Sequence, residues 1–393
     1  MHVLFVPPNS WTNHPNPMRH HFIFNRLANL PGCKIHVLNF EGLGGSRKIN
    51  NPELVFNENI QLINVRSLSI DNPAVYYALT SKSVWRMIDR ALSHLQIDVV
   101  VQSNLIPGVI ACNLARRAKI PLVYDCIEYY PESASAYFRG PLAKTLAYDV
   151  VNTLMKHLVR NSDVVITVSD AHAELVRKAA PNVSVEVVPN GVDFGLFKPS
   201  DRRGATAEDG SKLALVYVGS LDEWLDFEAV IEAIHNLRRA GLDLSLTVVG
   251  GSHGGYYLER VKDLSKTYSL ERHVMFTGFV PYRLIPFFVN AADVALAPYK
   301  RIAKNNVTPL KVLEYLASGK IVACTRIPEI SRRFEGLVNF YEGAGELTNL
   351  LESISSDRSS FEKRASAARE MLAGYSWDLL AEKYHHILRS VAN

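Results

Sequence analysis

Several features are scarce or missing in this 393-residue sequence, and each absence excludes a class of protein. No apolar run approaches the ~18 residues that a membrane-spanning helix needs. The first residues, MHVLFVPPNSW, lack the basic stretch, apolar segment and small-residue cleavage site of a signal peptide, so a first strand is expected there. No two of the four cysteines form a CxxC pair. We therefore expect buried reduced thiols, not a disulfide or a zinc site, at Cys33, Cys112, Cys126 and Cys324.

Charge and dinucleotide signals are also weak. The formal net charge is +4, which does not suggest a protein that binds nucleic acid. A mild positive charge is compatible with an anionic small ligand or an anionic membrane surface. The loop after the expected first strand, PPNSWTNHPNP, contains no GxGxxG, and this disfavours a Rossmann dehydrogenase.

A repeated alternation of strands and helices is present. Apolar, β-branched runs such as HVLFV (2–6) and KIHVL (34–38) are separated by helix-length amphipathic stretches, and the pattern begins again with LALVYVG (213–219) and LSLTVVG (244–250). Near-continuous apolar strands that alternate with helices predict parallel sheets covered on both faces. The expected fold class is therefore α/β, with two consecutive doubly wound units.

A polar segment separates the two units. Residues 198–212 contain Gly and few large apolar residues, so they are expected to form a linker or an exposed loop. The predicted domains are 1–197 and 213–374. Residues 375–393 carry apolar side chains at helical spacing and are expected to form a final amphipathic helix.

The strongest local feature is NNVTPLKVLEYLASGK (305–320). Thr308 is a good N-cap, Pro309 falls at the first helical position, and Gly319 stands where a helix ends in a left-handed residue, so a helix is predicted over 309–318. Its start follows a strand, DVALAPY (293–299), so its free amides would lie at the carboxyl edge of a sheet and attract an anion.

Two side chains of that helix have the chemistry for a nucleotide ligand. Lys311 adds a full positive charge in the first turn, and Glu314, about one turn further on, could accept hydrogen bonds from sugar or ribose hydroxyls. A pyrophosphate with a ribose attached would use both residues. The alternative is that both belong to a solvated helix face. The Gly-rich turn GGSHGG (250–255) could also face a phosphate, although a plain tight turn explains it as well.

These residues resemble the donor-site helix of family-4 retaining glycosyltransferases, which have the GT-B fold. The resemblance extends over nearly the whole chain in order: VYDCIEYYPE (123–132) is similar to YDxHExxPE, VEVVPNGVDFGLF (185–197) contains the recurrent Pro-Asn-Gly-Val-Asp, and VYVGSLDEW (216–224) resembles the phosphate loop that opens the second domain. FTGFVP (276–281) resembles the strand end beside the nucleotide base. The final helix resembles the one that crosses back to the first domain.

The resemblance implies a donor site and a reaction. Gly219, Ser220, Val280 and Leu310 fall at donor-binding positions, besides Thr308, Pro309, Lys311 and Glu314. The implied activity is transfer of a hexose-type sugar, with retention, from a UDP- or GDP-linked donor to a glycan or lipid-linked acceptor. The leaving phosphate would take the acceptor proton. No Asp-x-Asp triplet is present, so no obligatory metal or other cofactor is expected.

The sequence departs from the family pattern at three places. The family's first donor carboxylate falls on Asn306, which cannot supply a charge. Ser220 occupies the position of a phosphate-gripping Arg, so Lys311 is the first candidate cation, with Lys300, Arg301 and Lys304 as candidates that compensate. The family His falls on Ile127; Asp125 and Glu128 remain nearby as candidate catalytic residues, with a structural role slightly favoured for each.

Candidate acceptor-side residues follow the first strand. They are Asn9, Trp11, His20 and His21, although packing roles are favoured for the histidines. Residues 139–160 are amphipathic and basic; a helix on the core with a solvated basic side is favoured over a peripheral membrane contact. The expected location is cytoplasmic, with the membrane face as the alternative. A GT-B sugar-nucleotide epimerase and a non-catalytic sugar-nucleotide-binding protein are the alternative functions.

Overall fold

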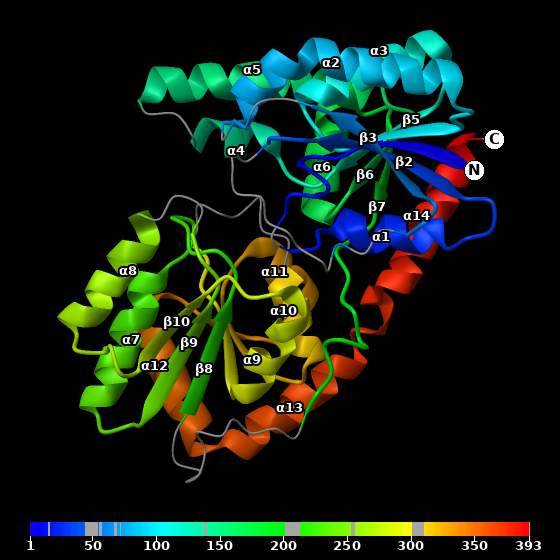
Figure 1. The fold of residues 1–393 in the computed structure, drawn as a ribbon. Coiled ribbons are helices and arrows are strands. Elements are labelled where there is room, and N and C mark those ends of the chain that lie inside the picture. Colours follow the sequence, from blue (N-terminus) through cyan, green and yellow to red (C-terminus); the bar gives the residue numbers. More distant parts are fainter. Residues whose placement is uncertain are drawn as a thin grey trace. The chain divides into compact units, whose positions relative to one another are not determined.

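The computed structural model of the chain describes most of its residues and divides into two compact units. The described residues are 1–14, 16–43, 54, 57–66, 69–70, 72–136, 140–200, 213–252, 256–300 and 310–392. The first unit comprises Met1–Asn190 together with Trp377–Asn393, and the second comprises Gly191–Ser376. Figure 1 shows one parallel sheet with flanking helices in each unit.

The first unit is built on a seven-stranded sheet with the order β3-β2-β1-β4-β5-β6-β7, and every strand pair is parallel. Its strands are β1 (His2–Val6), β2 (Lys34–Phe40), β3 (Ile60–Val65), β4 (Val99–Gln102), β5 (Leu122–Cys126), β6 (Val164–Thr167) and β7 (Ser184–Val187). The order in which strands are added to the sheet reverses between β1 and β4. In an open α/β sheet, ligands bind at the carboxyl ends of the strands beside such a reversal.

Helices cover both faces of this sheet. They are α1 (Arg19–Ala28), α2 (Pro73–His94), α3 (Ile106–Ala118), α4 (Tyr130–Ala136), α5 (Pro141–Arg160), α6 (Asp170–Ala179) and α14 (Trp377–Ala392). On one face α3 lies between α2 and α5, and their inner residues form a core with alternate strand residues such as Leu4, Val100 and Tyr124. On the other face α1 packs against α14.

The second unit has a six-stranded parallel sheet with the order β10-β9-β8-β11-β12-β13. Its strands are β8 (Leu213–Val218), β9 (Leu244–Val249), β10 (Val274–Gly278), β11 (Val294–Ala297), β12 (Ile321–Thr325) and β13 (Asn339–Tyr341). Its helices are α7 (Phe227–Arg239), α8 (Tyr256–Thr267), α9 (Ile285–Ala291), α10 (Leu310–Ala317), α11 (Pro328–Phe334), α12 (Gly343–Ser356) and α13 (Arg358–Glu370), with short 3-10 turns at Tyr282–Leu284 and Ala373–Tyr375. The apolar runs of the sequence thus become the buried strands of two doubly wound sheets.

The segment between Gly191 and Phe197, placed in the first domain by the sequence, packs with the second unit. The Val192 N–H donates to the Tyr375 carbonyl at 2.8 Å, and the Phe197 ring lies 5.6 Å from the Tyr282 ring. These contacts are long-range in sequence, which explains why the polar composition of 198–212 was the only local sign of a boundary. Residues 201–212 lie outside the described ranges.

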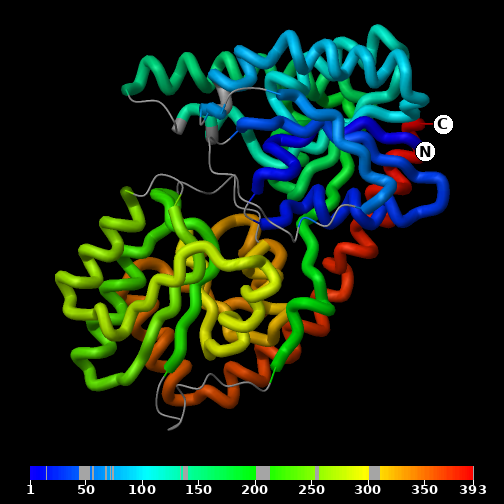
Figure 2. The backbone as a smooth tube through the Cα atoms, in the orientation of Figure 1, coloured from blue at the N-terminus to red at the C-terminus, as the bar shows by residue number. Residues whose placement is uncertain are grey.

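The final helix completes the first unit. Figure 2 shows the red C-terminal segment running beside the blue first helix. The Trp377 ring stacks on the Phe22 ring at 4.9 Å with 7° between the planes, and the Arg26 guanidinium contacts the Asp378 carboxylate at 2.6 Å. Trp377 is fully buried, so its indole fixes α14 on α1 mainly through apolar burial.

Replacement of this anchor should weaken the first unit. We expect Trp377→Ala to lower the free energy of unfolding by about 3–5 kcal/mol, because it leaves a cavity against Phe22. Urea denaturation followed by circular dichroism would measure the change. Leu379→Ala on the same helix is the control, since that side chain is half exposed and should cost much less. Equal losses in the two variants would contradict the anchoring role.

Candidate functional site

Three loops meet by backbone contact at the carboxyl edge of the second sheet. The Gly219 N–H, after β8, donates to the Val249 carbonyl, and the Gly250 N–H, after β9, donates to the Gly278 carbonyl of β10, both at 2.9 Å. The Leu221 N–H donates to the Gly251 carbonyl at 2.7 Å. The loops therefore form one continuous backbone surface that is poor in side chains.

Glycine is required where these loops approach one another. Gly250 has a φ of +138°, and a Cβ added there would lie 2.0 Å from the Gly219 carbonyl oxygen. A Cβ at Gly251 would lie 2.6 Å from the Phe279 ring. The contact at Gly250 is with backbone and excludes a side chain, whereas at Gly251 the Phe279 ring would have to move aside. The glycines thus let the loops after β8 and β9 pack closely and keep side chains out of the space between them.

The Lys311 ammonium lies against this backbone surface. α10 begins at Leu310, and the Lys311 Nζ donates to the Tyr217 hydroxyl at 2.9 Å and lies 4.2 Å from the centroid of the same ring. It lies 5.2 Å from the Tyr299 ring. A Cβ on Gly219 would come within 2.9 Å of the ammonium. The cation is therefore held by aromatic faces and a hydroxyl at the loop that follows β8.

Burial moves the pKa values of both candidate groups on α10 toward neutrality. Burial lowers the pKa of the Lys311 ammonium to about 7, although the Glu314 carboxylate opposes this shift. Burial raises the pKa of Glu314 to about 7, against a hydrogen bond from Tyr282 and the charge of Lys311. The Tyr282 hydroxyl donates to Glu314 Oε1 at 2.7 Å. A bound anion would restore the full charge on Lys311.

The other predicted donor residues fall into two groups. Ser220 accepts the Tyr217 hydroxyl at its carbonyl, and Val280 is partly exposed after β10. Lys300 lies 3.6 Å from Glu228 Oε2 and 5.0 Å from the Tyr257 ring, so its charge is already partly balanced. The predictions on Arg301, Lys304, Asn306, Thr308 and Pro309 lie outside the described residues.

In the first unit, Asp125 lies at the centre of a buried polar cluster. Its Oδ2 lies 3.0 Å from His20 Nε2 and 3.5 Å from the Arg19 guanidinium, and it accepts the Tyr384 hydroxyl at 3.1 Å. Arg19 also donates to the Val188 carbonyl at 3.0 Å. Asp125 is fully buried and links α1, β5 and α14, and Arg19 extends the cluster to the segment that follows β7. This favours a structural role.

Two residues of this cluster are charged: Arg19 is positive and Asp125 is negative. Burial raises the pKa of Asp125, but the Arg19 charge and the hydrogen bonds of His20 and Tyr384 outweigh it, so its net pKa is lowered. Burial lowers the pKa of His20, despite its bond to Asp125. At neutral pH we therefore take His20 as neutral, donating from Nε2 to the ionised Asp125.

The remaining acceptor-side candidates differ in exposure. His21 accepts the Met18 N–H at Nδ1 and donates from Nε2 to the Trp11 carbonyl, and its ring stacks on the buried Trp11 indole at 3.9 Å. Asn9, by contrast, is exposed after β1. Glu128 is partly exposed after β5. The first sheet thus presents Asn9 and Glu128 to solvent, while Trp11, His20 and His21 pack inside.

No group of three His, Cys, Asp or Glu side chains that could hold a metal ion occurs within the described ranges. The four cysteines are buried and form no disulfide. Among the helices in the described part of the chain, none is long and apolar enough to cross a bilayer.

Comparison with known families shows which family the chain belongs to. Residues 200–371 match the model of the glycosyl transferases group 1, and residues 52–191 match the glycosyl transferase 4-like domain. The chain belongs to the group 1 glycosyltransferases. The match over 52–191 contains β3 to β7 of the first sheet, and the match over 200–371 contains all six strands of the second sheet together with α10.

Solved structures support the same fold. Sucrose-phosphate synthase from Thermosynechococcus elongatus has a TM-score of 0.80 at 15% identity, covering 99% of this chain and 98% of that one. HepE from Anabaena, solved with UDP and glucose, has a TM-score of 0.74 at 16% identity and covers 99% of each chain. The prediction of two Rossmann-like parallel units of the GT-B type is confirmed.

Curated relatives of this group 1 chain match over part of their length. A GDP-mannose-dependent alpha-(1-6)-phosphatidylinositol monomannoside mannosyltransferase from Mycobacterium tuberculosis is 27% identical over 253 residues, which is 61% of this chain and 65% of that protein. The chain spans about half to two thirds of the length of the first curated relatives it matches.

Four residues of these two sites were missed by sequence reasoning. They are Tyr217 and Tyr282, which hold Lys311 and Glu314, and Arg19 and Tyr384, which hold Asp125. All four contacts join positions on different elements far apart in the chain, so no local spacing reveals them. Arg19 had one usable signal, since it directly precedes the candidate His20.

The low pKa of Lys311 predicts a pH dependence of anion binding. Because the free lysine loses its proton above about pH 7, binding of a nucleotide diphosphate sugar should take up a proton, and affinity should fall as pH rises from 7 to 9. Calorimetry at pH 8 in buffers of different ionisation enthalpy would measure the uptake. Lys311→Met should abolish it. Affinity that is equal at both pH values would contradict this linkage.

Removal of the Asp125 charge tests whether this residue has a structural role. Asp125→Asn leaves the buried Arg19 without its counter-charge, so we expect about 3–5 kcal/mol less stability in chemical denaturation. Glu128→Gln, at a partly exposed neighbour, is the matched control and should be near neutral. If Asp125→Asn kept full stability and lost only turnover, Asp125 would instead have a chemical role.

Proposed function

We propose that this group 1 glycosyltransferase moves a hexose-type sugar, with retention of configuration, from a nucleotide diphosphate sugar to a glycan or lipid-linked acceptor. The observation that carries this proposal is the Lys311 ammonium beside Gly219 at the carboxyl edge of the second sheet. A cation with a lowered pKa, next to a glycine-containing loop, suits a group that must meet negative charge.

The leaving group is the natural partner of this cation. In the proposed reaction, the acceptor oxygen bonds to the anomeric carbon while the bond from that carbon to the phosphate oxygen breaks. The acceptor proton passes to the departing phosphate, which gains negative charge. Lys311 and the amino end of α10, which begins at Leu310, would stabilise that charge. The protein then needs neither a nucleophile of its own nor an obligatory metal.

Glu314 is proposed to bind hydroxyl groups of the donor. The Tyr282 hydroxyl already occupies Oε1 and fixes the carboxylate, so the second oxygen is the one available to a ribose or sugar hydroxyl. Asn306, Arg301, Thr308 and Pro309 remain part of the proposed donor site on the strength of the sequence, and so do Ser220, Val280 and Lys300. The base is left as uridine or guanosine, because a solved neighbour holds UDP and a curated relative is GDP-mannose-dependent.

The acceptor is proposed to bind at the carboxyl edge of the first sheet. Asn9 and Glu128, exposed or partly exposed after β1 and β5, are the groups that could contact it. Trp11, His20 and His21 would shape this edge from below. A lipid-linked acceptor would require work at a membrane face, so a cytoplasmic protein with a peripheral membrane contact is part of the same proposal. Nucleic acid is not a proposed partner.

Two alternative functions use the same donor site. A GT-B epimerase would convert a nucleotide sugar without an acceptor, and a binding protein would hold the donor without turnover. The Ser220 and Asn306 departures keep the binding protein as an alternative, because each removes a group that the family uses. Incubation with nucleotide sugars alone, and then with acceptor pools, separates the three. An epimer indicates the first alternative, and tight binding without any product indicates the second.

Substitution of the two α10 residues tests the proposed roles. Lys311→Ala should lower turnover by about 10²–10³-fold with the fold intact, because the leaving charge loses its cation. Glu314→Ala should mainly weaken donor binding, measured by calorimetry, and should raise KM more than it lowers kcat. Lys266→Ala on α8, an exposed lysine, is the control. Full activity in Lys311→Ala would remove this residue from the mechanism.

A further inference from the structure

The outer layer of helices on the first sheet carries both exposed apolar side chains and an excess of positive charge. This layer consists of α2, α3 with the adjoining Lys119, and α5; α3 lies between the other two helices. Six exposed large apolar side chains lie on α2 and α5: Val75, Leu79, Trp85, Leu142, Leu146 and Val150. Leu142 is 83% exposed and Leu79 is 68% exposed. Such a group of exposed apolar residues marks an interaction surface.

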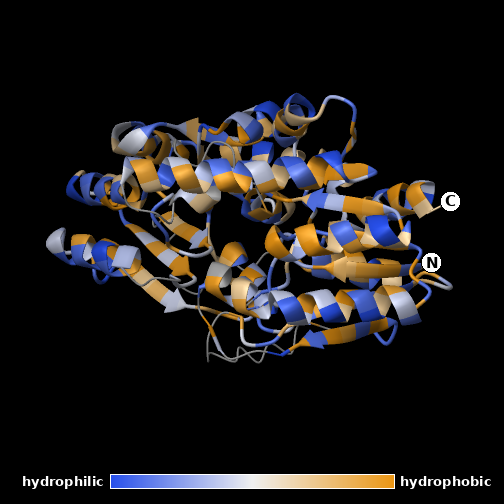
Figure 3. Ribbon diagram, turned by 90° about the horizontal axis from the view of Figure 1, so that it is seen from above, coloured by the Kyte–Doolittle hydropathy of each residue, from blue (hydrophilic) through white to orange (hydrophobic). Residues whose placement is uncertain are grey.

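The apolar residues follow helical spacing on the side that faces away from the core. On α5, Leu142, Leu146 and Val150 are four residues apart, while Met155 and Leu158 point to the buried side. On α2, Val75 and Leu79 share a face opposite the buried Val84 and Ile88. Figure 3, which looks down on these helices, shows orange apolar residues interspersed with blue ones along them.

Positive charge is concentrated in the same layer. It contains nine Lys and Arg residues and only two Asp residues, whereas the whole chain has a net charge of +4, so the rest of the chain is net negative. Lys82, Arg86 and Arg90 continue the exposed face of α2 beyond Leu79, and Arg160 continues that of α5. Asp89 and Asp149 are the acidic exceptions. This asymmetry fits an anionic surface.

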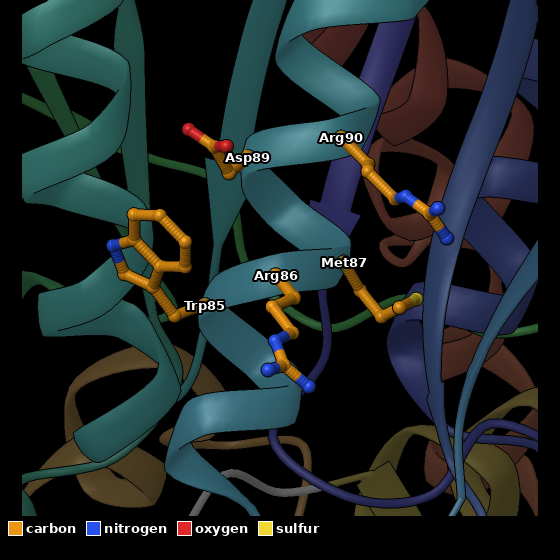
Figure 4. Close-up of a pocket in the computed structure, with 5 residues that line it drawn as sticks. All are labelled: Trp85, Arg86, Met87, Asp89 and Arg90. Carbon is orange, nitrogen blue, oxygen red and sulfur yellow. The ribbon is translucent and has the colours of Figure 1, made fainter.

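A shallow hollow on α2 combines the two kinds of side chain. Trp85, Arg86, Met87, Asp89 and Arg90 line it, and Figure 4 shows the indole and the two guanidinium groups extending from the same stretch of helix. A second hollow, between α4 and α5, is lined by Lys144 with Ser135, Thr145 and Tyr148. Indole rings prefer the membrane interface, and Arg and Lys beside them can contact phosphate headgroups.

The topology places the apolar ends of both helices at one edge. Each helix connects the carboxyl end of one parallel strand to the amino end of the next, so α2 and α5 both begin at the carboxyl edge of the first sheet. Val75, Leu79, Leu142 and Leu146 lie in the first turns of their helices. They therefore lie toward the edge at which β1 and β5 present Asn9 and Glu128.

We propose that the outer faces of α2 and α5 dock on an anionic lipid bilayer, with their first turns inserted at the interface and their basic later turns on the headgroups. This proposal rests on the proposed function, because it brings the acceptor edge of the first sheet to a membrane that holds a lipid-linked acceptor. Insertion needs no spanning helix, since apolar area and charge add to give reversible binding.

Vesicle co-sedimentation of the full chain tests this docking. One set of vesicles contains phosphatidylcholine alone, and the other contains phosphatidylcholine and phosphatidylglycerol in equal parts. We expect binding to the anionic set that weakens as salt is raised, and much weaker binding to the neutral set. A chain that stays in solution with anionic vesicles, or that binds both sets equally, would overturn the proposal.

Paired variants assign the surface. Leu142→Ser with Leu146→Ser, and separately Arg86→Glu with Arg90→Glu, should each weaken binding to anionic vesicles roughly tenfold. Met371→Ser and Arg239→Glu, at exposed positions of the second unit, are the matched controls and should bind as the wild type. If the double leucine variant does not fold by circular dichroism, Leu142→Ser alone should show a smaller loss. Wild-type binding by folded α5 and α2 variants would contradict the assignment.

Two further measurements separate this proposal from its alternatives. Lys311→Ala should bind vesicles as the wild type does, so failure of the transferase assay and failure of membrane docking are distinguishable. Light scattering without vesicles should give the same mass for the wild type and the α5 variant. A dimer that the α5 variant loses would assign the face to a second copy of the chain and overturn the membrane proposal.

Discussion

The proposed donor chemistry depends on one buried lysine, Lys311, whose ammonium contacts a tyrosine hydroxyl and aromatic rings. The Lys311 ammonium rests on the Tyr217 ring and donates to its hydroxyl, and burial outweighs the attraction of Glu314. A lysine paired to a carboxylate at hydrogen-bond distance would already be neutralised and would gain little from a phosphate. In the free protein, burial destabilises the charged form of Lys311. An anionic group bound at Gly219 would stabilise that charge. The glycine contacts matter for the same reason, because any Cβ there would fill the space beside the ammonium.

The first unit uses charge in the opposite way. Arg19, His20 and Tyr384 all contact one oxygen of Asp125, Oδ2, so that oxygen is surrounded by groups of the protein itself. Residues of the same chemical type therefore have different roles according to their partners. Burial alone does not separate them, since Glu314 and Asp125 are both buried. The distinction lies in the contacts of each carboxylate: Asp125 has the Arg19 guanidinium at 3.5 Å and accepts a hydrogen bond from His20, whereas Glu314 accepts one from Tyr282 and its lysine lies about one helical turn away.

The sequence predicts the fold more completely than the site. Apolar runs such as HVLFV and LALVYVG predict buried parallel strands, because only strands covered on both faces lack alternation. Gly319, with a φ of +67°, ends α10 as its position predicts. The partners of Lys311 and Glu314 could not be predicted, because Tyr217 and Tyr282 reach α10 from other elements, 94 and 32 residues away. The exposed α2 face was missed for another reason: its apolar residues look like core residues until burial identifies the opposite face.

The first unit is assembled from both ends of the chain. Trp377 and Tyr384 on α14 reach Phe22 and Asp125, which precede them by more than half of the sequence. A growing chain therefore exposes the apolar surface of α1 and leaves the Asp125 cluster without Tyr384 until the second unit has been synthesised. Domains generally fold in the order in which they leave the ribosome. In this protein the second unit can complete its structure earlier than the first, and α14, which follows the second unit in the sequence, closes the first unit.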